Sequence, residues 1–101
     1  MDAVQWLEEW YYAHCDGDWE HGSGIHIGTL DNPGWSVSIN LEGTELENVL
    51  FTPIDESFRS ENDWLICRVE KNEFLGFGGS KNLKEILSVF RTWVDDQQKK
   101  Q

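Results

Sequence analysis

Two stretches of alternating apolar and polar residues, on either side of a turn signal, place the firmest limit on the fold. The turn signal is Asp31-Asn32-Pro33-Gly34, in which proline presets φ and glycine accepts a positive φ. The residues that alternate toward one side are Ile25, Ile27 and Thr29 before the turn, and Trp35, Val37, Ile39 and Leu41 after it. This period of two predicts a β-hairpin with one buried face, and with Ser36, Ser38 and Asn40 on the wet face.

A second hairpin and an edge strand are predicted further along the chain. Trp64 to Glu70 and Glu73 to Phe77 are strand-like segments joined across Lys71-Asn72. The stretch from Val49 to Phe58 is apolar but contains Pro53, which cannot donate a ladder hydrogen bond. We therefore expect an edge strand or a bulge there.

Amphipathic helices are predicted near both termini. From about Asp2 to His14, and again after Gly78-Gly79, apolar residues share one arc at 100° per residue. Asn82, with Glu85 three residues on, predicts a capping box at the start of the second helix. The order of elements predicts a single α+β domain over residues 1–101, with an antiparallel sheet of about five strands between an N-terminal and a C-terminal helix. Whether both helices cover the same sheet face stays open.

The charge of the chain is strongly negative and unevenly distributed. Residues 1–63 hold 14 Asp and Glu against Arg59 alone, whereas residues 64–101 hold 5 acids and 7 bases, for a net charge of −11. Such a field repels nucleic acid and anionic membranes and speeds association with a basic partner. We expect neither nucleic acid nor a membrane as partner, although acidity also serves plain solubility. The N-terminus has no signal-peptide pattern, so a cytoplasmic location is expected.

The densest polar cluster runs from His14 to His21, with His26 nearby. Counted from Asp16, the glycine and glutamate positions of an EF-hand calcium loop hold His21 and Ile27, so the spacing fails. A zinc site would need a second pair of ligands, which the sequence does not offer. Cys15 beside a histidine is a conceivable nucleophile, but the neighbouring acids disfavour a thiolate. We expect no metal, no cofactor and no catalytic residue.

Trp19 lies between Asp18 and Glu20 in a predicted turn. An indole ringed by charge is typical of an interface anchor. It can equally fold back and cap the core, and the sequence leaves both outcomes open.

Long segments of the chain resemble the immunity protein 53 family of bacterial polymorphic toxin systems. They are WLEEWYYAHC, the following run CDGDWEHGSGIHIGTLDNPGWSVSINL, then SENDWLICRVE and the closing GFGGSKNLKEILSVFRTWV. The resemblance implies a small cytoplasmic α+β protein that binds and neutralises a cognate toxin and has no enzymatic activity. The matching positions that we take as candidate partner-binding residues are Asp16, Asp18, Trp19, Glu20, Asp31 and Trp35.

The function expected from these observations is inhibition of a basic toxin by electrostatically complementary binding. One alternative is a small hydrolase or metal-dependent enzyme that uses the cluster His14, Cys15, Asp16 and His21. A second is an acidic adaptor domain. A competing docking site lies at Glu42, Glu45 and Glu47. The oligomeric state is open.

Overall fold

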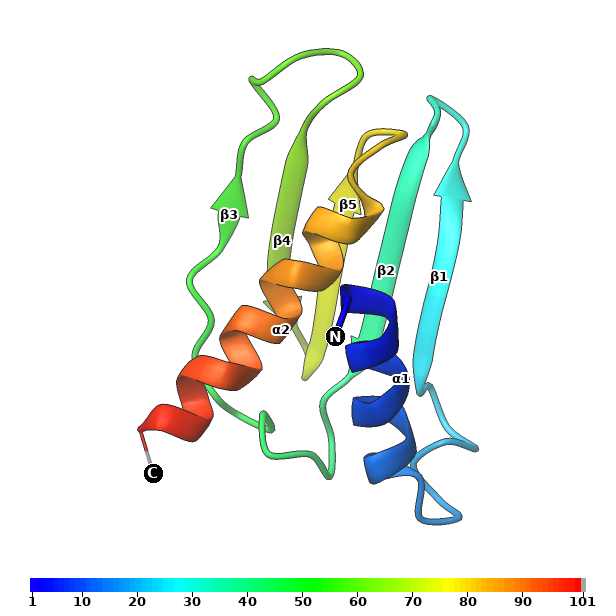
Figure 1. Cartoon of the computed structure of the whole chain (residues 1–101), viewed down its shortest axis with the longest axis vertical. Coiled ribbons are helices and arrows are strands. Elements are labelled where there is room, and N and C mark those ends of the chain that lie inside the picture. The colour runs from blue at the N-terminus through cyan, green and yellow to red at the C-terminus, as the bar shows by residue number, and fades with distance from the viewer. Residues whose placement is uncertain (101) are drawn as a thin grey trace.

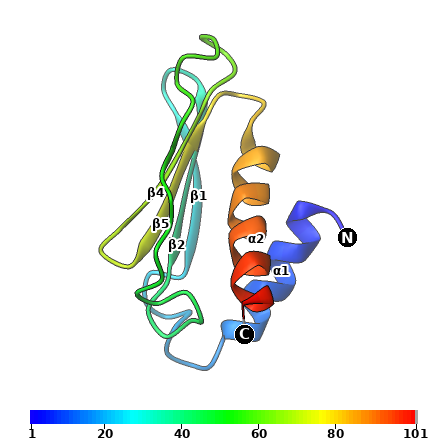
Figure 2. The ribbon, with the colours of Figure 1, turned by 90° about the vertical axis from the view of Figure 1, so that its left-hand side faces the viewer.

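A five-stranded antiparallel sheet carries both helices on one of its faces (Figures 1 and 2). The structure is a computed structural model that describes residues 1–100. The elements are α1 (Ala3–His14), β1 (Ile25–Leu30), β2 (Gly34–Asn40), β3 (Ile54–Asp55), β4 (Leu65–Glu70), β5 (Glu73–Gly78) and α2 (Leu83–Lys99). The strand order is β1-β2-β5-β4-β3. The predicted α+β class is confirmed, and the open question about the helices is settled in favour of one shared face.

The predicted first hairpin is confirmed. Ile25 lies opposite Ile39 and Ile27 lies opposite Val37, so the alternating residues share the face under the helices. In the second hairpin Lys71 and Asn72 both adopt positive φ, of 52° and 59°, as a two-residue turn of type I′ requires. The segment with Pro53 forms only the two-residue edge strand β3, because proline interrupts the ladder.

An aromatic core fills the space between the helices and the sheet. Phe90 of α2 is fully buried and meets Phe74 of β5 and Trp10 of α1, at ring-centroid distances of 5.2 Å and 5.0 Å. The helix comes close because Gly76 has no side chain: a Cβ atom there would lie 2.4 Å from Cγ2 of Ile86. Burial of such large rings is the main source of stability in a domain of this size.

The helix starts differ from the sequence-based prediction. The capping box predicted at Asn82 is wrong, because its side chain makes no cap hydrogen bond to α2. Its Oδ1 atom instead accepts from the backbone N–H groups of Trp64 and Gly79, and the residue is only 6% exposed. A complete capping box forms at α1, where Asp2 and Gln5 bind each other's backbone N–H groups.

Candidate functional site

The loop after α1, residues 15–24, is held by its own carboxylates. Oδ1 of Asp16 accepts from the backbone N–H groups of Asp18, at 2.9 Å, and of Trp19, at 3.0 Å. The Glu20 carboxylate accepts from those of Asp16, at 2.9 Å, and Gly17, at 2.8 Å. The bonds from Trp19 and Asp18 lower the pKa of the Asp16 carboxyl, since they favour its charged form. The pKa of Glu20 is lowered by its own backbone N–H and by those of Asp16 and Gly17.

Trp19 folds back onto the core. Its side chain is only 8% exposed, and its ring lies edge-on to Trp10 at a centroid distance of 5.8 Å. Its Nε1–H donates to the backbone oxygen of Asn40, the last residue of β2, at 3.2 Å. The indole thus anchors the loop to the sheet. Of the two outcomes that the sequence left open, Trp19 takes the one in which it folds back and caps the core.

A second acidic loop, residues 41–48, lies beside the first. Oε1 of Glu45 lies 2.7 Å from Nε2 of His14, and Oε2 accepts from Nε1–H of Trp10 at 3.3 Å. The Nδ1 atom of His14 lies 2.7 Å from the backbone oxygen of Trp10, so both ring nitrogens of His14 have a polar neighbour. The backbone N–H of Asn40 donates to the oxygen of Gly24 at 2.8 Å and joins the bases of the two loops.

We call these two loops the acidic end. Its side chains are Asp16, Asp18, Glu20, Glu42, Glu45 and Glu47, and the chain contains no Lys or Arg before Arg59. Residues 16–20 of the favoured docking site are therefore neighbours of residues 42–47 of the competing site. The predicted hairpin already implies that the two loops are neighbours, because an antiparallel pair that turns at residues 31–34 must bring residue 24 beside residue 40.

Asp31 and Trp35 lie apart from the acidic end. They sit at the far end of β1, whose six residues span roughly 20 Å. Asp31 is exposed in the turn, whereas Trp35 is half-buried and its Nε1–H donates to the backbone oxygen of Ser80 at 2.9 Å. The six candidate residues therefore do not form one patch.

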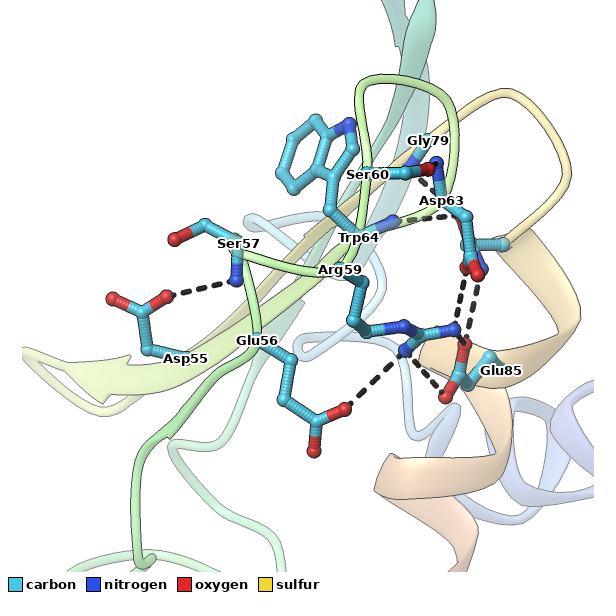
Figure 3. A network of polar contacts seen from close by, with 10 residues as sticks. Asp55, Glu56, Ser57, Arg59, Ser60, Asp63, Trp64, Gly79 and Glu85 are labelled. Atoms are coloured by element: carbon cyan, nitrogen blue, oxygen red, sulfur yellow. Dashed lines mark hydrogen bonds and ion pairs between the residues drawn. The ribbon is translucent and has the colours of Figure 1, made fainter.

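A cluster around Arg59 gathers carboxylates (Figure 3). It belongs to the β3–β4 loop, which lies at the same end of the sheet as the β1–β2 turn (Figure 1). The guanidinium contacts both oxygens of Glu85, at 3.0 Å and 3.1 Å, and also Asp63 and Glu56. The hydrogen bonds with Glu85 raise the pKa of Arg59. Nδ2 of Asn82 donates to Asp63 and Glu85, so the cluster ties the β3–β4 loop to the start of α2. No motif in the sequence indicated it.

The comparison with known families decides the assignment. The family model described as immunity protein 53 matches residues 4–95 of the 101-residue chain. The chain belongs to the immunity protein 53 family. No curated protein and no solved structure matched it. An immunity role is thus shown at the level of the family.

The chemical alternatives find little support in the geometry of this immunity protein. Sγ of Cys15 donates to the backbone oxygen of Tyr11 at 3.2 Å, and no hydrogen bond joins it to a histidine within residues 1–100. Burial, with Glu85 nearby, raises the pKa of the Cys67 thiol to about 12, which disfavours a thiolate. In the described part of the chain, no three His, Cys, Asp or Glu side chains gather as a metal site would require. No helix there is long and apolar enough to cross a membrane.

Proposed function

We propose that this protein neutralises the cognate toxin of a bacterial polymorphic toxin system, in the cytoplasm, by binding a basic surface of the toxin with its acidic end. The observation that carries the proposal is the placement of six carboxylates on two adjacent loops, in a chain with no Lys or Arg before Arg59. Membership of the immunity protein 53 family supplies the class of partner.

Within the acidic end, the carboxylates divide into two groups. Asp16 and Glu20 bind backbone N–H groups and hold the loop, and Glu45 binds His14. Asp18, Glu42 and Glu47 are exposed, and none forms an ion pair with another side chain in residues 1–100. We assign the second group to direct contact with the toxin and the first group to positioning.

This division favours tight binding for a physical reason. A loop already fixed by four backbone hydrogen bonds and the buried Trp19 loses little conformational freedom on binding. The carboxyl end of α1 also points into the loop, so the negative end of the helix dipole adds to the field of the carboxylates. A toxin domain that acts on an anionic substrate carries a basic surface, and such a surface is the match for this field.

Binding to the toxin encoded beside this gene tests the proposal. We expect the purified protein to bind that toxin domain, and co-expression to rescue cells from it. Stopped-flow association should slow as salt rises, because charges farther apart than about 8 Å are screened at physiological ionic strength. Absence of binding and rescue contradicts the proposed function, and an on-rate that is flat with salt contradicts its electrostatic part.

A further inference from the structure

The outer edge of β1 is unprotected. β1 is the first strand in the sheet order, and Figure 1 shows no strand or helix beyond it. Its sequence, Ile-His-Ile-Gly-Thr-Leu, contains no Lys, Asp, Glu or Pro, and its register with β2 runs without a bulge. Edge strands normally carry a charged residue, a proline or a bulge, which prevents pairing with a strand of another chain. The opposite edge strand, β3, has only two residues and follows Pro53, so the two edges differ.

The backbone groups that face outward from β1 can be assigned. The backbone N–H of Asn40 donates to Gly24, so these two residues form a hydrogen-bonded pair in the ladder. Because such pairs alternate along an antiparallel ladder, His26, Gly28 and Leu30 also bond to β2. The N–H and C=O groups of Ile25, Ile27 and Thr29 therefore point away from the sheet, and none bonds to another group in the described chain.

An apolar groove runs beside this edge, between α1 and β1. It has a volume of about 390 Å³ and is lined mainly by Val4, Leu7, Tyr11, Ile25, Ile27 and Leu87. Val4 and Ile27 are 57% and 44% exposed, although the periodicity of α1 places Val4 on its apolar arc. Apolar side chains gathered beside unpaired strand groups are typical of a surface that a further strand covers.

We propose that a second copy of this chain docks on β1 and forms a continuous ten-stranded antiparallel sheet, with the two-fold axis at Ile27. In this register Ile27 pairs with itself, and Ile25 pairs with Thr29 of the other copy. All three are residues whose backbone groups point outward, so the pairing is self-complementary and satisfies the outward groups of both copies. The side chains of Ile25 and Ile27 of one copy then lie beside the groove of the other.

Charge favours this arrangement over other modes of self-association. Each copy has a net charge of −11, but the residues from 21 to 30 contain no Asp or Glu. Antiparallel pairing sends the two acidic ends to opposite ends of the joined sheet, so the strongest like charges are kept apart. Both acidic ends also stay accessible. The remaining repulsion between copies means that salt strengthens the dimer, the opposite of its effect on association with a basic toxin.

The test is the mass of the protein in solution. Sedimentation velocity from low to high micromolar concentration should show the 11.7 kDa chain converting to a species of twice that mass, more completely at higher salt. Ile27→Lys and Thr29→Pro should each remain monomeric over the same range. Proline at position 29 removes an outward N–H and leaves the bonds to β2 in place. Thermal melts at low concentration establish that both variants are folded.

Tyr12→Lys is the matched control, because it makes the same charge change at an 81% exposed residue of α1 that does not line the groove. It should dimerise as the unmodified protein does. A protein that stays monomeric at every concentration overturns the proposal. So does a dimer that survives both Ile27→Lys and Thr29→Pro. If the protein is monomeric and Ile27→Lys loses toxin binding, the dimer proposal is also overturned, and the edge of β1 is assigned to the toxin. Toxin binding by the unmodified protein is measured separately, as the test of the proposed function.

Discussion

The two ends of the sheet both collect carboxylates, but those carboxylates meet different partners. Around Arg59, the side chains of Glu56, Asp63 and Glu85 converge on one guanidinium. At the acidic end, Asp16 and Glu20 bind backbone N–H groups, and Asp18 forms no ion pair in the described residues. The number of acidic residues in a segment therefore says little about their role. The role of each carboxylate depends on the groups that it contacts.

The difference has an energetic consequence. Ion pairs and bidentate contacts make the Arg59 cluster cohesive, because each carboxylate there lies next to the same cation. The acidic end instead carries uncompensated charge, and mutual repulsion among its carboxylates weakens when a cationic partner binds. We therefore propose that one end stabilises the fold and that the other binds the partner.

The largest predicted effect on stability is at Trp19, which anchors the acidic end to the core. Trp19→Ala should lower the free energy of unfolding by about 3–5 kcal/mol, as large-to-small changes of buried aromatic residues do. Urea denaturation measures it, with Tyr12→Ala as an exposed control that should change stability little. A stable Trp19→Ala protein with weakened toxin binding would mean that the indole is a contact residue after all.

A smaller fall in stability is predicted at the other end of the sheet. Arg59→Met removes the cation that Glu85, Asp63 and Glu56 share, so the melting temperature should fall by several degrees. The toxin affinity of the folded protein should stay unchanged. Arg68→Met is the comparison: within residues 1–100 the one ion pair of Arg68 is with Glu70, so its loss should lower the melting temperature less. Loss of toxin affinity in Arg59→Met, without loss of stability, would reverse the roles that we assign to the two ends.

The smallest predicted effect is a change in the pH dependence of stability. The folded-state pKa of Asp16 is lowered from 3.8, so its charged form stabilises the fold above that pH, and the contribution is lost as pH falls through the folded-state pKa. Asp16→Asn should therefore be less stable than the unmodified protein at neutral pH. The gap in melting temperature should close under more acidic conditions. A gap that is constant with pH would show that the charge of Asp16 does not hold the loop.

Local patterns predicted much of the fold. The alternation around the turn at residues 31–34 predicted the hairpin of β1 and β2 and the face that Ile25, Ile27, Val37 and Ile39 share, because successive side chains of a strand point to opposite faces. Pro53 likewise predicted an edge position for its segment, because proline cannot donate in a central ladder.

The features that sequence reasoning missed depend on long-range contacts. The side chain of Asn82 could cap a helix or accept hydrogen bonds from distant backbone groups. Only the approach of Trp64 and Gly79 in the folded chain selects the second role. The Arg59 cluster joins residues up to 26 positions apart, which no local spacing reveals. The burial of Trp19 depends on the end of β2, which lies 21 residues further along the chain.

The central claim is that the acidic end, and not negative charge in general, binds the toxin. Two double variants separate these possibilities: Asp18→Lys with Glu42→Lys at the acidic end, and Asp31→Lys with Glu61→Lys at the opposite end. All four residues are exposed, and both doubles change the net charge equally. Isothermal titration with the cognate toxin should show the first double weakened by about 100-fold, or roughly 2.7 kcal/mol, and the second by less than about tenfold. Equal weakening in the two doubles, or greater weakening in the second, would contradict the account.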